Sequence, residues 1–102
     1  MSPEGSLKQE QLAELCRRHG VRRLALFGSA QREDFDPARS DLDFVVEFEA
    51  LPPGVYAHTY FALLEALKQL YGRPVDLLEA GSVRNPYIRE EIEATQVTVY
   101  AA

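Results

Sequence analysis

The sequence is poor in cysteine and lacks tryptophan altogether: its 102 residues include one Cys and no Trp. A single cysteine excludes an intrachain disulfide, which suits a reducing compartment and predicts a cytoplasmic protein. Cys16 lies on an apolar stripe of helical spacing with Leu12 and Leu15. We therefore interpret it as a small core residue, not as a nucleophile.

Long apolar runs are also missing. No segment is long enough to cross a bilayer, and the first five residues have no apolar stretch of the kind that a secretion signal needs. We therefore expect no membrane association.

Positive charge is scarce. Eleven Lys and Arg residues face sixteen Asp and Glu residues, giving a net charge of −5. A protein that grips nucleic acid by its phosphates usually carries a basic surface, so nucleic acid is not expected as a direct partner. One local basic group, Arg17, Arg18, Arg22 and Arg23, is interpreted as a helix C-terminus followed by a solvated turn.

The chain shows no internal repeat and no low-complexity segment. Its length and its 46% hydrophobic content suit a single domain over residues 1–102, with 1–5 expected to be flexible. So short a chain has little room for a separate substrate domain, and a partner could complete its site.

The apolar periodicity predicts helices alternating with short strands. Ser6 and Gln9 have the spacing of a capping box, Gly20 and Gly72 suit helix ends, and Asn85-Pro86 suits a helix start. In chain order, we predict a helix from Ser6 to Gly20, strands over 23–27 and 42–48, a helix over 55–70, a strand over 74–78, a helix over 85–94 and a strand over 97–100. The expected fold is α+β, a short mixed sheet flanked by helices.

Two carboxylates open one of the apolar strands. The segment Ser40-Asp41-Leu42-Asp43 follows a Gly28-Ser29 turn that ends the preceding strand. Asp41 and Asp43 are two residues apart, so on a strand they point to the same face, about 6–7 Å apart. Magnesium prefers one or two carboxylates with substrate phosphates completing its shell. The alternative is a pair of solvent-facing acids at a strand edge.

The turn before these acids suits a phosphate. Glycine lets the backbone approach a ligand closely, and free N–H groups at a turn form a nest for anions. An ordinary turn between strand and helix is the alternative for Gly28-Ser29. Arg32 could bind phosphate through its guanidinium group, but a solvated loop arginine is nearly as well supported.

A third acid, Asp76, sits between Val75 and Leu77 in an otherwise apolar strand. If this strand lies next to the strand that carries Asp43, the Asp76 carboxylate can reach the same cluster. The alternative is a lone acid on an edge strand.

These residues together resemble the polymerase-beta-type nucleotidyltransferase superfamily. The resemblance is carried by Gly28-Ser29, Arg32, Ser40-Asp41-Leu42-Asp43 and Val75-Asp76-Leu77-Leu78. The short length resembles the minimal nucleotidyltransferase branch, which is often the antitoxin partner of a helical HEPN toxin. Two departures lie in the loop. Eleven residues separate Ser29 from Asp41, where the family usually has ten, and Gln31-Arg32-Glu33 replaces the favoured Ala-Arg-Gly.

The resemblance implies an activity: transfer of a nucleotidyl group, with ATP as the expected donor, to a hydroxyl. It implies Asp41, Asp43 and Asp76 as catalytic residues and ligands of two Mg²⁺ ions, with Asp76 also activating the incoming hydroxyl. Gly28, Ser29, Arg32 and Ser40 would bind the nucleotide. The favoured acceptor, a tyrosine of a HEPN toxin, rests on the resemblance alone.

Two other functions stay open. The chain could be a binding-only antitoxin with vestigial catalysis; the three intact acids argue against this, and the altered loop leaves room for it. It could also be a nucleotidyltransferase that acts on RNA or a small molecule, although the acidic charge disfavours RNA.

Overall fold

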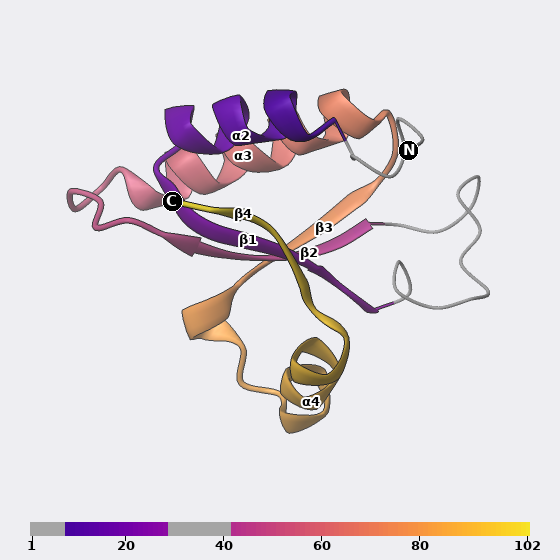
Figure 1. Ribbon diagram of the computed structural model, residues 1–102. Coiled ribbons are helices and arrows are strands. Elements are labelled where there is room, and N and C mark those ends of the chain that lie inside the picture. Colours follow the sequence, from indigo (N-terminus) through magenta and orange to yellow (C-terminus); the bar gives the residue numbers. More distant parts are fainter. Residues whose placement is uncertain (1–7, 29–41) are drawn as a thin grey trace.

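The computed structural model describes residues 8–28 and 42–102 of the chain. Three α-helices, one short 3-10 helix and four strands make up this part (Figure 1). In chain order they are α2 (Gln9–Arg18), β1 (Val21–Phe27), β2 (Leu42–Phe48), α3 (Tyr56–Tyr71), β3 (Val75–Glu79), η2 (Ala80–Ser82), α4 (Pro86–Thr95) and β4 (Val97–Ala101).

The four strands form one mixed sheet in the order β3-β2-β1-β4. β1 runs antiparallel to both β2 and β4, and β2 runs parallel to β3. The helix α3 connects the two parallel strands, as such a crossover requires. The predicted α+β fold with a short mixed sheet is confirmed.

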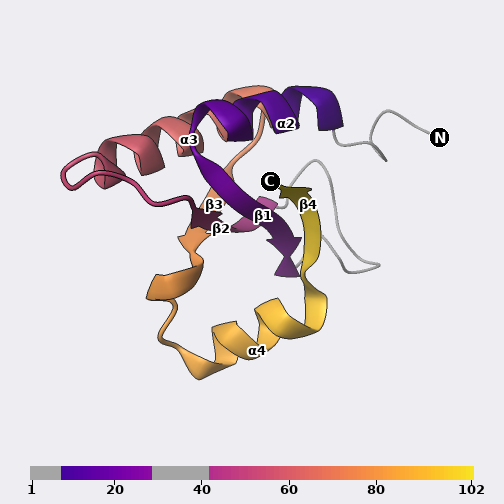
Figure 2. The same cartoon turned by 60° about the vertical axis from the view of Figure 1, so that its left-hand side comes forward.

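Helices cover the two faces of the sheet unequally. α2 and α3 lie side by side on one face, and α4 lies on the other (Figures 1 and 2). Because successive strand residues point to opposite faces, each central strand serves both layers. Phe44 and Val46 of β2 join the core under α2 and α3, whereas Val45 joins a smaller cluster with Ile92 of α4.

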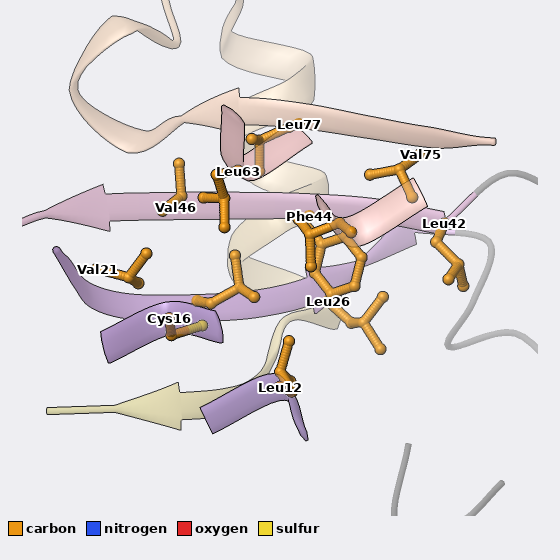
Figure 3. Packing of buried hydrophobic residues seen from close by; sticks show 12 residues of the cluster. Leu12, Cys16, Val21, Leu26, Leu42, Phe44, Val46, Leu63, Val75 and Leu77 are labelled. Carbon is orange, nitrogen blue, oxygen red and sulfur yellow. The ribbon is translucent and has the colours of Figure 1, made fainter. Parts of the chain in front are cut away.

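The larger core lies between the sheet and the α2–α3 layer (Figure 3). Leu63 and Leu67 of α3 and Leu12 and Cys16 of α2 are fully buried in it. Burial raises the pKa of the Cys16 thiol to about 12, which makes it a poor nucleophile. The interpretation of Cys16 as a core residue is confirmed.

Most of the predicted boundaries agree with the structure. β2 has the predicted bounds, and Asn85 caps α4 by accepting a hydrogen bond from the Tyr87 N–H at 2.8 Å. Gly72 ends α3 with φ +65°, a conformation that suits glycine. β1 begins two residues earlier than predicted, because Val21 is buried and pairs with Phe48.

The predicted start of the first helix is wrong. α2 begins at Gln9, and its N-cap is Lys8 at φ 56° with no side-chain cap, so Gln9 cannot close a capping box with Ser6. Tertiary contacts take these side chains instead: Lys8 Nζ donates to the Leu70 carbonyl, and Gln9 Nε2 donates to the Val99 carbonyl. Ser6 and the flexible segment predicted over 1–5 lie outside the described residues.

The basic group is engaged within the fold. Arg17 and Arg18 lie in the last turn of α2 and form ion pairs with Glu14, and Arg23 pairs with Glu47 across β1 and β2. The interpretation as a helix end is confirmed for Arg17 and Arg18. The predicted solvated turn is wrong for Arg22 and Arg23, because both lie in the strand β1. Over residues 8–28 and 42–102, no helix is both long and apolar enough to cross a membrane.

Candidate active site

Asp43 and Asp76 lie directly opposite each other on neighbouring strands. β2 and β3 pair in parallel, and the register matches Asp43 to Asp76. Neighbouring strands are about 4.8 Å apart, and residues matched in register point to the same face. Their strand neighbours Leu42, Phe44 and Leu77 pack into the larger core, so both carboxylates face the α4 side of the sheet. The strand of Asp76 therefore lies next to the strand of Asp43, which is the condition for both carboxylates to belong to one cluster.

Gly28 lies beside this pair, one residue past the end of β1. Its neighbour Phe27 is matched to Asp43 in the β1–β2 register. The residue has φ +74°, and a Cβ atom there would lie only 2.9 Å from Oδ2 of Asp43. The position therefore favours glycine both for its backbone conformation and for the space that the Asp43 carboxylate takes.

Two residues of α4 complete the surroundings of Gly28. The Thr95 hydroxyl accepts a hydrogen bond from the Gly28 N–H at 2.8 Å and donates one to the Glu91 carbonyl at 2.7 Å. Oε2 of Glu91 lies 3.7 Å from the position that a Gly28 Cβ would occupy. α4 thus brings a hydroxyl and a carboxylate to the space next to Asp43.

The sequence reasoning missed Thr95 and Glu91. Their four-residue separation places them on one side of a helix, but that spacing is common on any helix. The fold alone brings them to Gly28, which is 67 residues away from Thr95 in the chain.

The contact also bears on the predicted phosphate nest. The Gly28 N–H already donates to Thr95. N–H donors for a phosphate would therefore have to come from the residues that follow Gly28. Gly28 itself would contribute space, because it has no side chain.

The Asp76 side of the site is open to solvent at the edge of the sheet. Asp76 is exposed, and β3 is the edge strand. Burial, with a smaller contribution from the Asp76 charge, raises the pKa of Tyr60, whose hydroxyl donates to the Leu77 carbonyl. Tyr60 therefore stays protonated near neutral pH. Because Asp76 is exposed on an edge strand, an acceptor group could reach it from outside.

Four of the predicted site residues, Ser29, Arg32, Ser40 and Asp41, lie outside the described residues. Within residues 8–28 and 42–102, no three Asp, Glu, His or Cys side chains gather closely enough to hold a metal ion. The described part supplies two of the three carboxylates predicted for metal binding, and they are adjacent. Carboxylate oxygens are the ligands that magnesium prefers, so this pair fits the predicted ion.

Comparison with known proteins agrees with this geometry. The family model described as "Nucleotidyltransferase domain" matches residues 8–97. "Putative protein adenylyltransferase MJ0128" of Methanocaldococcus jannaschii is 35% identical over 85 residues, which are 83% of each chain. "Putative protein adenylyltransferase MJ1379" of the same organism is 32% identical over 97 residues, 87% of this chain and 95% of that protein.

Solved structures agree as well. A structure described as "putative minimal nucleotidyltransferase" is 33% identical with a TM-score of 0.65, covering 88% of this chain and 87% of that one. A chain from the complex of the tri-AMPylated Shewanella oneidensis HEPN toxin with its MNT antitoxin shares the fold, at 16% identity and a TM-score of 0.63 over 94% and 71% of the two chains. The protein belongs to the nucleotidyltransferase domain family, in its minimal, polymerase-beta-like branch.

Proposed function

We propose that this nucleotidyltransferase moves AMP from ATP to a tyrosine hydroxyl of a HEPN-type toxin and so acts as its antitoxin. The observation that supports this most directly is the register match of Asp43 with Asp76 beside Gly28. It places two carboxylates on one face of the sheet, next to Gly28, a position that favours glycine.

Each candidate residue has a distinct part in this proposal. Asp41, Asp43 and Asp76 would hold two Mg²⁺ ions, which would supply positive charge to the attacking and leaving oxygens. Ser29, Arg32 and Ser40 would bind the triphosphate, with Gly28 leaving space for it.

The reaction itself is an in-line displacement at the α-phosphorus. The acceptor oxygen forms the new bond to phosphorus while the bond to the pyrophosphate leaving group breaks, and Asp76 takes the hydroxyl proton. The attacking oxygen has to lie about 3–3.5 Å from the α-phosphorus before the reaction.

A partner protein is the proposed acceptor for two reasons. Asp76 lies exposed on the edge strand β3, which allows a group of another protein to approach it from outside. The related fold from the toxin complex occurs beside an AMPylated HEPN toxin. The helix α4 offers exposed groups for docking: Tyr87 is 80% exposed, and Arg89, Glu90 and Glu93 are exposed as well. We expect the reaction in the cytoplasm, where ATP is supplied.

The test is to incubate the protein with a HEPN-type partner and Mg-ATP and to record the intact masses of both chains. The expected result is an added adenylyl mass on the partner, located on tyrosine by peptide mapping, and none on this chain. Omitting Mg²⁺ should abolish the added mass.

A binding-only antitoxin would give a different result. The partner's ribonuclease activity would then be inhibited with no mass change, and Asp43→Asn would inhibit it as well as the unaltered protein. A nucleotidyltransferase for RNA or a small molecule would leave the partner unmodified while still releasing pyrophosphate from ATP when the true acceptor is added.

A further inference from the structure

One hydroxyl joins the last turn of α4 to the end of β1. Thr95 Oγ1 accepts the Gly28 N–H and, as donor, bonds the Glu91 carbonyl one helical turn earlier. Its proton therefore goes to Glu91, and its oxygen lone pair faces Gly28. Both hydrogen bonds have ordinary lengths, 2.8 and 2.7 Å, and Gly28 is buried. A buried N–H that loses its partner is costly, so this contact restrains where Gly28 can lie.

Gly28 is itself one of the predicted nucleotide-binding residues, and it is the last described residue before Ser29. Its backbone also lies against the Asp43 carboxylate. A shift of Gly28 would therefore change the space that is left for a nucleotide beside the Asp43 carboxylate. Displacements of about 1 Å in such a site can cost about a hundredfold in rate.

We propose that Thr95 is a positioning residue for nucleotide binding: through the Gly28 N–H it holds Gly28 against the Asp43 carboxylate. This proposal deepens the proposed function and rests on it. Thr95 is not proposed to touch the substrate, because its hydroxyl is used by Gly28 and by the helix.

The packing of α4 does not depend on this hydroxyl. Ile92 is the buried residue of α4 and packs with Ala25, Phe27 and Val45, with Ile88 partly buried against the same cluster. Removing the Thr95 hydroxyl should therefore leave the helix in place and release only Gly28. This difference separates a positioning role from a general structural one.

The test uses Thr95→Val, which keeps the shape and removes the hydroxyl, and Thr95→Ser, which keeps the hydroxyl. Thr98→Val is the matched control, since the Thr98 hydroxyl also accepts a hydrogen bond, from Arg23, but on β4 and away from Gly28. The probe is Mg-ATP, with Kd measured by titration calorimetry. The hydrogen-exchange rate of the Gly28 amide, measured by NMR, reports the hydrogen bond directly.

We expect Thr95→Val to raise Kd for Mg-ATP about tenfold, equivalent to about 1.4 kcal/mol, and to speed exchange at the Gly28 amide. Thr95→Ser and Thr98→Val should both keep the wild-type Kd and slow exchange at Gly28. If Thr95→Val fails to fold, Thr95→Ala serves in its place.

Three results would overturn the proposal. The first is an unchanged or lower Kd in Thr95→Val, which would mean that Thr95 competes with phosphate for the Gly28 N–H or has no influence on it. The second is a failure of Thr95→Ser to retain binding. The third is an absence of Mg-ATP binding by the unaltered protein, which would overturn the proposed function as well. In the first two cases the proposed function survives.

Discussion

The two faces of the sheet differ in what they bury. Between α2, α3 and the sheet lies one cluster of twelve buried residues, eight of them from the strands β1, β2 and β3 and four from the two helices. The face under α4 carries a cluster of four buried residues, and next to it lie Asp43, Asp76 and Gly28. Burial of apolar area stabilises the fold mainly through the first face, and the second face is left free for chemistry.

On β2, a residue of the larger core and a residue of the candidate site are direct neighbours in the chain. On β2, Phe44 is fully buried against the helices, and the adjacent Asp43 faces the opposite side. Because strand side chains alternate, a charge can be placed next to a fully buried ring without entering the core. Substitutions in the larger cluster should therefore change mainly stability, and substitutions of Asp43 and Asp76 should change mainly activity.

The largest expected effect is on transfer. Asp43→Asn and Asp76→Asn each remove one charge and little volume, so each should lower the rate of adenylyl transfer about a thousandfold or more, equivalent to about 4 kcal/mol. The thermal unfolding midpoint should stay close to that of the wild type. The rate is measured as adenylyl mass added to the HEPN-type partner with time.

Glu47→Gln is the matched control for these variants. Glu47 lies on the same strand and is paired with Arg23, away from the Asp43–Asp76 pair. It should transfer at nearly the wild-type rate. Wild-type rates in both Asp variants would show that the carboxylate pair takes no part in catalysis.

The next effect is on stability. Leu63→Ala leaves a cavity in the larger cluster, where Leu63 is fully buried, and should lower the free energy of unfolding by about 3 kcal/mol. Ile92→Ala, in the smaller cluster beside solvent, should cost less, about 2 kcal/mol. Urea unfolding measures both. A larger loss for Ile92→Ala than for Leu63→Ala would mean that the α4 face carries more of the stability than its burial indicates.

The fold could be predicted well where local signals and burial agree. The alternation of β2 set both of its faces, and Asn85-Pro86 set the start of α4. The capping box predicted with Ser6 was wrong, because α2 begins at Gln9 with Lys8 as its N-cap. The side chains of Lys8 and Gln9 bond to the distant carbonyls of Leu70 and Val99. A local motif of two residues cannot compete with tertiary contacts that the sequence does not reveal.

The candidate site shows the same division. The sequence pattern predicted which acids belong to the site, because they lie in apolar strands with alternating side chains. In the structure, the parallel pairing of β2 with β3 places Asp43 opposite Asp76. The parts played by Thr95 and Glu91 depend on how α4 crosses the sheet. That packing is set by the Ile92 cluster, so no spacing in the sequence could indicate it.

A smaller effect is expected at Gly28. Gly28→Ala should cost about 1–2 kcal/mol of stability because of its positive φ, and it should lower Mg-ATP affinity, because the new methyl group would lie 2.9 Å from Oδ2 of Asp43. Gly72→Ala is the matched control: its φ is +65°, and a Cβ there meets nothing within 4 Å. It should lose similar stability and no affinity. Equal affinities in the two variants would remove Gly28 from the nucleotide site.

The smallest effect tests whether the α2–α3 face is closed to solvent. Burial raises the pKa of the Cys16 thiol from 9.0 to about 12, so at pH 8 the folded protein holds about a thousandfold less thiolate than an ordinary thiol would. Iodoacetamide should leave Cys16 unmodified at pH 8 in buffer and alkylate it in urea, as read by mass spectrometry.

The same shift fixes the sign of a pH dependence. Above about pH 9 the unfolded chain loses the Cys16 proton before the folded chain does, so this thiol lowers the free energy of unfolding as the pH rises toward 12. Below pH 9 the thiol is protonated in both the folded and the unfolded chain, so it does not make the free energy of unfolding depend on pH.

Rapid alkylation of the folded protein at pH 8 would show that the larger cluster opens readily. The contrast between a closed apolar face and an open acidic one would then no longer hold.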